Sequence, residues 1–168
     1  LVKSVLIEFA NKQRGEQQVE DKEDKKMETV KSLNHVGIAV HSIESQRAYY
    51  EDALGAEFEG FEEVPSQKVR VGFFRVENVR LELLEPTDPS GPIAKFLEKR
   101  GEGLHHLAFS VDDIQARIDA LKQSGLQMID EQPRGGAHHM KIAFIHPKSS
   151  HGVLTELCEP ANAHHDGQ

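Results

Sequence analysis

The chain has 168 residues, a formal net charge of -8 and 38% hydrophobic residues. This length is typical of one domain with a core of its own, and no apolar run approaches the roughly 18–20 residues that span a bilayer, which argues against a membrane protein. The acidic balance argues against a nucleic-acid binder, because such proteins need clustered lysine and arginine.

The two ends of the chain differ in composition from its middle. Residues 11–26, NKQRGEQQVEDKEDKK, are almost wholly polar and cannot bury enough apolar surface to offset the entropy of ordering them. We therefore expect residues 1–30 to form a disordered leader and residues 161–168 to form a loose tail.

The first structured segment begins with an alternating run of branched residues from His35 to Val40, which predicts a strand. A helix is expected from about Ile43, capped by Ser42 and ending near Gly55. Two or three strands are expected next, covering roughly 67–76 and 79–85. Residues 33–88 thus form a first βαβββ module.

A helical connector is expected over residues 89–103, with Pro92 near its start and Gly101 at its end. A second module over residues 104–160 repeats the order of the first. We expect its elements as a strand at 104–111, a helix from Asp113 to Ser124, and strands near 126–130, 141–146 and 153–158.

Internal repetition supports this division into two modules. The matching pairs are HVGIAVHSI at 35–43 with HLAFSVDDI at 106–114, RVGFF at 70–74 with KIAFI at 141–145, and ELLEP at 82–86 with ELCEP at 156–160. A module of about 55 residues is marginal alone, so we expect an α+β fold in which the two modules share one sheet or core.

Strand parity indicates which side chains in the repeats meet. Alternation places His35 and His106 beside small residues on one face of their strands, where a ligand would have room. Glu82 and Glu156 each interrupt an apolar run in the last strand of a module. A carboxylate there costs several kcal/mol to bury unless it is paired or bound to a metal.

His35, Glu82, His106 and Glu156 therefore form a candidate site for a divalent metal. A lone strand histidine is more often a hydrogen-bonded core residue, and a Glu82 that points to water is the commonest way for the hypothesis to fail. Recurrence of the same pair in both modules favours the metal. Two imidazoles and two carboxylates suit Co²⁺, Ni²⁺, Mn²⁺ or Zn²⁺. Two open positions on such an ion would accept a 1,3-dioxygen substrate and stabilise its enolate.

The remaining histidines and cations carry weaker signals. His105 has the opposite parity from His106, so we expect it to point away from the site. His138 and His139 lie in a glycine-rich stretch, GGAHH, that is either a rim over the site or an ordinary loop. The strand cations Lys68, Arg70 and Lys141 either contact phosphates of a nucleotide-bearing substrate or are simply solvated.

The chain resembles the methylmalonyl-CoA epimerases of the vicinal oxygen chelate superfamily from about Leu33 to Pro160. The segments that carry the resemblance are LNHVGIAV, NVRLELLEP, GEGLHHLAFSVDDI and FIHPKSSHGVLTEL. The resemblance implies paired βαβββ modules that form a cup-shaped mixed sheet around a metal, usually cobalt, in a homodimer. Carried over by position, it implies the same ligands: His35, Glu82, His106 and Glu156.

The resemblance also implies a 1,1-proton transfer at the α-carbon of an acyl-CoA substrate, through a metal-stabilised enolate. Glu156 is expected as one of the two catalytic proton-transfer groups. The second is a carboxylate in at least one relative, and Val71 stands at that position here. Glu63, Gln67 through a water, or a residue near His138 are the candidates that remain.

Two alternative functions remain open at this point. A glyoxalase I-type lactoylglutathione lyase would share the metal set and the module, although the HPKSSHG loop favours the epimerase. A metal-free small-molecule binding protein of the same fold would dispense with the four ligands.

Cys158 is the only cysteine, so we expect a reducing, cytoplasmic environment.

Overall fold

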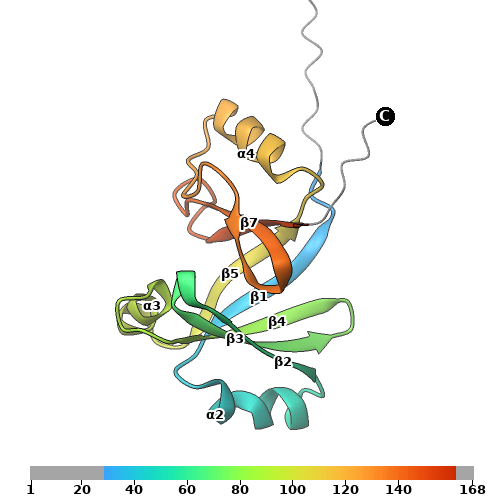
Figure 1. The fold of residues 1–168 in the computed structure, drawn as a ribbon, viewed down its shortest axis with the longest axis vertical. Helices are drawn as coiled ribbons and strands as arrows, with labels where there is room; N and C mark the ends of the chain where they lie inside the picture. The colour runs from blue at the N-terminus through green and yellow to red at the C-terminus, as the bar shows by residue number, and fades with distance from the viewer. Residues whose placement is uncertain (1–28, 162–168) are drawn as a thin grey trace, which may run out of the picture.

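A computed structural model describes residues 29–161, which form one mixed sheet of eight strands flanked by helices (Figure 1). The strands are β1 Ser32–Ala39, β2 Glu57–Val64, β3 Val69–Val76, β4 Val79–Pro86, β5 Gly103–Ser110, β6 Arg134–Gly135, β7 Met140–Ile145 and β8 Thr155–Pro160. The helices are α2 Ile43–Ala48, which continues into a π-helical turn Tyr49–Ala53, α3 Pro92–Arg100 and α4 Ile114–Gln123.

The sheet is built from two equivalent halves. Its strand order is β2-β3-β4-β1-β5-β8-β7-β6, so each half reads the same way outward from the centre. Within the halves β1 lies parallel to β4 and β5 lies parallel to β8, and the halves join through the antiparallel pair β1 and β5. The predicted α+β fold with two repeated βαβββ units in one sheet matches this topology.

Helices α2 and α4 lie at opposite ends of the molecule (Figure 1) and cover the outer face of one half each. Ile43 at the start of α2 packs with Phe74 and Leu83, whereas Ile118 of α4 packs with Ala143 and Leu157. The alternation of each strand leaves its other residues on the inner face, where α3 also packs. Burial of the outer faces therefore fixes which side chains point inward.

A second pair of repeated glutamates ties these helices to the sheet. The backbone N–H of Ile43 donates to Glu85 at 2.7 Å, and that of Ile114 donates to Glu159 at 2.8 Å. The repeat extends to their cations, because Arg70 lies 3.9 Å from Glu85 and Lys141 lies 3.0 Å from Glu159. These two cations are thus engaged in anchoring the helices, which was not among the roles predicted for them.

Most predicted elements occur, and the differences have local causes. Ser42 caps α2 through its side chain, as expected, and Asp113 caps α4 in the same way. The strand expected near 126–130 is reduced to an isolated bridge between Met128 and Ile145. There the Asp130 carboxylate accepts the backbone N–H of Phe144 in place of a ladder bond. The leader over 1–30 and the tail over 161–168 fall almost wholly outside the described residues.

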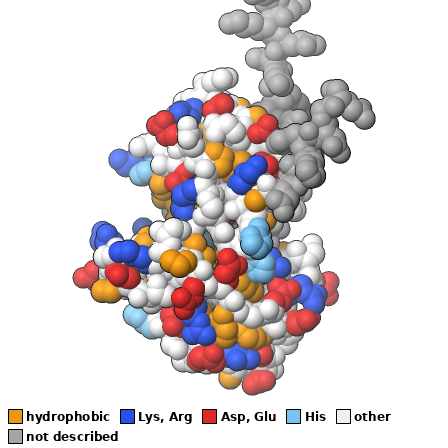
Figure 2. All heavy atoms as spheres, viewed as in Figure 1, with side chains coloured by type: hydrophobic (Ala, Val, Ile, Leu, Met, Phe, Trp, Pro, Cys, Tyr) orange, Lys and Arg blue, Asp and Glu red, His pale blue; other side chains and the backbone are white. Residues whose placement is uncertain are grey.

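Residues 29–161 include no helix that could span a membrane, and the face seen in Figure 2 has no broad basic area. Every helix among these residues is too short or too polar to traverse a bilayer. Acidic and basic side chains are intermingled over that face.

Candidate metal centre

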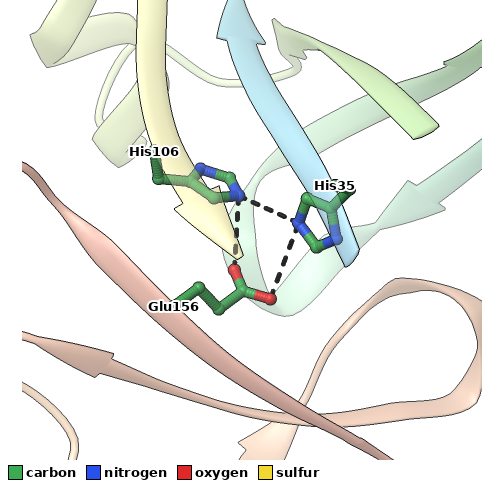
Figure 3. Close-up of side chains that lie close together, drawn as sticks. All are labelled: His35, His106 and Glu156. Carbon is green, nitrogen blue, oxygen red and sulfur yellow. Dashed lines mark hydrogen bonds and ion pairs between the residues drawn. The ribbon is translucent and has the colours of Figure 1, made fainter. Parts of the chain in front are cut away.

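Three side chains from three strands converge on the inner face (Figure 3). The Nε2 atoms of His35 on β1 and His106 on β5 lie 3.0 Å apart. The Glu156 carboxylate on β8 reaches to 3.7 Å from His35 and 3.4 Å from His106. All three residues are buried, with exposed fractions of 6% or less. Strand alternation and the central β1–β5 pairing bring them together, as the repeat predicted.

Glu82 on β4 lies beside this group rather than within it. Its carboxylate is 3.5 Å from Nδ1 of His35, on the far side of the ring from the Nε2 atom that faces His106. The group of potential ligand atoms that lie within 4.8 Å of one another contains only His35, His106 and Glu156 among the described residues. Glu82 is nevertheless buried and does not point to water.

Each histidine of the group is oriented by the residue that precedes it. Asn34 places Oδ1 3.0 Å from Nδ1 of His35, and His105 places Nδ1 2.9 Å from Nδ1 of His106. The β1–β5 pairing is irregular at both points, so Asn34 and His105 are extra residues in bulges. A bulge re-aims a side chain, which is why the parity prediction for His105 was wrong.

Sequence reasoning missed both orienting residues, although a signal was present. Asn34 and His105 occupy equivalent places in the repeat, directly before its two histidines, and both can hydrogen-bond to a neighbouring imidazole. A ligand histidine commonly binds a second group through its other ring nitrogen, which fixes its tautomer. That repeated polar pair could have been read as a supporting shell.

The group lies in a cavity of about 250 Å³. Pockets that enclose a whole drug-sized ligand measure roughly 300–1,000 Å³, so only the reacting end of a larger molecule would fit inside. The lining includes the cations Arg80 and Arg134, neither of which was predicted, and the apolar residue Val71. His138 also lines the cavity, so the GGAHH stretch forms part of its rim.

Burial shifts the protonation equilibria of the group toward neutral forms. It lowers the pKa of His35 to about 4 and holds the pKa of His106 well below its ordinary value. It raises the pKa of Glu82 to about 7, and it raises the pKa of Glu156 well above the ordinary value. Each neutral imidazole can donate a lone pair to a metal ion. The two carboxylates, when ionised, lack a counter-charge.

These properties fit a divalent cation. Nitrogen and oxygen ligands lie about 2.0–2.2 Å from such an ion, so neighbouring ligand atoms are separated by roughly 2.8–3.1 Å in an octahedral arrangement and by roughly 3.3–3.6 Å in a tetrahedral one. The three separations among His35, His106 and Glu156 run from 3.0 to 3.7 Å. A dication would also supply the counter-charge that two buried carboxylates require.

Comparison with known proteins decides the family. Residues 34–144 match the glyoxalase/bleomycin resistance protein/dioxygenase superfamily. The ethylmalonyl-CoA/methylmalonyl-CoA epimerase of Cereibacter sphaeroides is 42% identical over 127 residues, which cover 74% of this chain and 95% of that protein. The chain belongs to the methylmalonyl-CoA epimerase family of the glyoxalase superfamily. The recognition made from its sequence motifs is thereby confirmed.

Further members of the epimerase family support the same assignment. The human mitochondrial methylmalonyl-CoA epimerase is 40% identical over 126 residues, covering 74% of this chain and 72% of that protein. A solved methylmalonyl-CoA epimerase in complex with methylmalonyl-CoA and NH4+ superposes with a TM-score of 0.77 at 33% identity, covering 80% of this chain and 98% of that chain. The predicted fold and the predicted enzyme class, an isomerase, are confirmed.

Proposed function

We propose that this chain epimerises methylmalonyl-CoA by moving the α-proton of the thioester from one face to the other, with a divalent metal as cofactor. The observation that carries the proposal is the convergence of His35, His106 and Glu156 in one cavity of a chain from the epimerase family. The volume of the cavity suits the acyl end of the substrate, and the nucleotide part would remain outside.

His35, His106 and Glu156 are the proposed metal ligands, with Glu82 as the fourth. The spacing of the first three and the neutral state of both imidazoles support this assignment. Burial of Glu82 beside His35 supports the fourth. The bound metal would act as a Lewis acid that stabilises negative charge developing on the thioester oxygen.

Glu156 is the proposed base that removes the α-proton. A carboxylate is a competent general base where it lies within reach of the proton that it removes. The same side chain lines the cavity in which the α-carbon would lie. Arg80 and Arg134 also line the cavity, and each is paired there with a protein carboxylate, Glu59 and Asp130 respectively.

A Glu156→Gln variant tests this function. The wild-type protein, loaded with metal, should epimerise methylmalonyl-CoA and exchange its α-proton with deuterated solvent, whereas the variant should lose exchange and keep its fold. Exchange at the wild-type rate in the variant would show that Glu156 is not the base. Turnover of the glutathione hemithioacetal of methylglyoxal in place of methylmalonyl-CoA would favour a glyoxalase I-type lyase.

Cobalt is the proposed metal, with nickel, manganese and zinc as the other borderline ions that nitrogen and oxygen ligands accept. Elemental analysis of protein purified without chelator tests this choice, and absence of any metal would favour a metal-free binding protein. The family assignment also leads us to propose a homodimer, which light scattering would test. The cytoplasmic location stays a prediction.

A further inference from the structure

An epimerase needs a proton-transfer group on each face of the α-carbon, and Glu156 supplies only one of them. We propose that His138 is the second group, which exchanges a proton with the face opposite Glu156. This inference rests on the proposed function and adds a named residue to it.

The lining of the cavity leaves few alternatives. Its titratable carboxyl and imidazole groups are His35, Glu82, His105, His106, His138 and Glu156. The proposed metal ligands account for four of them, and His105 is held by His106. His138 is the remaining titratable group of the lining, because it is neither a proposed metal ligand nor bonded to one.

The other residues considered from the sequence do not serve. Val71 is buried in the lining and has no proton to transfer. Glu63 is exposed on β2 and does not line the cavity. Gln67 lines it, but an amide does not titrate, and its Nε2 donates to the carbonyl of Gly135.

His138 belongs to the second half of the chain, as Glu156 does, but its rim contacts the first half of the sheet. Its ring packs edge-to-face on Phe73 of β3, with the ring centroids 3.9 Å apart. Its backbone N–H donates to Glu62 of β2 at 2.8 Å. The rim that carries His138 is thus docked on the first half, whereas Glu156 projects from β8 in the second. A substrate between them would present one face to each.

The backbone at His138 is held in an uncommon conformation. His138 has φ 52°, in the left-handed region that non-glycine residues rarely adopt. Such residues persist where the surrounding contacts impose them, and they cluster at functional sites. The contacts to Glu62 and Phe73 hold His138 at the rim. The residue is also exposed at the rim, so its imidazole can exchange protons with solvent between turnovers.

The proposed step balances in both directions. In one direction the Glu156 carboxylate takes the α-proton, and the electron pair of the broken C–H bond moves into the thioester carbonyl to give an enolate. The imidazolium N–H of His138 then gives its proton to the other face, and the enolate electron pair forms the new C–H bond. In the reverse direction neutral His138 takes the proton and protonated Glu156 returns one.

A His138→Asn variant tests the inference, because asparagine tolerates the left-handed conformation and cannot transfer a proton at neutral pH. His139→Asn is the matched control, since His139 has φ 54° and does not line the cavity. Each metal-loaded protein is assayed for epimerisation of methylmalonyl-CoA and, separately for each epimer, for α-proton exchange with deuterated solvent. If His138→Asn does not fold, His138→Gly takes its place in the assay, because glycine adopts the left-handed conformation without strain.

We expect His138→Asn to lower epimerisation by about 100-fold or more, the usual contribution of a general acid or base. The epimer whose proton faces Glu156 should still exchange it with retention, and His139→Asn should behave as wild type. Epimerisation by His138→Asn within a few-fold of the wild-type rate would overturn the role of His138. So would an equal fall in epimerisation and in exchange of the α-proton that faces Glu156. A wild-type protein that does not epimerise would instead overturn the proposed function and this inference together.

Discussion

Gly37 faces His106 across the β1–β5 pair so closely that a β-carbon on Gly37 would lie 2.2 Å from Cε1 of the imidazole. The same β-carbon would lie 2.4 Å from Nδ1 and 2.8 Å from Nε2 of that ring. These separations are far inside van der Waals contact. The imidazole can therefore occupy its place in the cavity only because position 37 has no side chain.

Gly37→Ala should displace His106 and weaken metal binding together with epimerase activity. Overpacking of this kind should lower the free energy of unfolding by only about 1–3 kcal/mol, so the variant should fold. Metal content and urea unfolding of the purified variant check both parts. Gly135→Ala is the control, because a β-carbon there meets no atom within 4 Å. Full metal occupancy at wild-type affinity in Gly37→Ala would contradict the prediction.

His105 offers a test of the supporting contacts around the centre. His105→Phe removes the Nδ1 contact to His106 and keeps an aromatic ring against Phe96, so metal affinity should fall about 10- to 100-fold while the melting temperature changes little. Metal titration monitored by a competing chelator measures the affinity. Phe96→Leu, which alters the packing of His105 and leaves its imidazole in place, should change affinity much less. Equal affinities in His105→Phe and wild type would remove His105 from the site.

Glu82 should make the metal-free protein less stable as pH rises. Burial raises the pKa of Glu82 from an ordinary 4.5 to about 7, so between these values the folded state binds a proton that the unfolded state has released. The stabilisation is complete below about pH 4.5 and is lost as pH rises through about 7. The loss amounts to about 3 kcal/mol.

Glu82→Gln removes this ionisable group and keeps an oxygen that can bind metal. With chelator present, the variant should exceed wild type in stability at pH 8 by up to about 3 kcal/mol, and the difference should shrink toward pH 5. Urea unfolding at both pH values measures it. A difference that is the same at pH 5 and pH 8 would show that Glu82 is not the group that titrates.

Regular strands were predictable from the sequence, and departures from regularity were not. Parity placed His35, His106 and Glu156 on one face because the alternation is regular from His35 onward in β1 and from His106 into the following residues of β5. It failed at His105, where a bulge adds one residue to the pairing. The neighbourhood of His138 was identified, but its place over the first half depends on contacts to Glu62 and Phe73 from a distant part of the chain. No local pattern encodes such contacts.

The repeated glutamates Glu85 and Glu159 should contribute unequally to stability, although each binds the first turn of a helix. Both accept the first backbone N–H of a helix and both lie near a strand cation. The side chain of Glu159 is 2% exposed and lies 3.0 Å from its lysine, whereas that of Glu85 is 24% exposed and lies 3.9 Å from its arginine. Solvent screens the more exposed pair, so its loss costs less.

We therefore expect Glu159→Ala to lower the free energy of unfolding by about 3 kcal/mol and Glu85→Ala by about 1 kcal/mol. Urea unfolding of the two variants gives the comparison directly. Both carboxylates bind the helices that cover the outer face, away from the metal ligands, so the folded fraction of each variant should keep its metal and its turnover. A larger cost for Glu85→Ala would mean that the contact to the helix terminus, and not burial of the ion pair, determines the stability of each half.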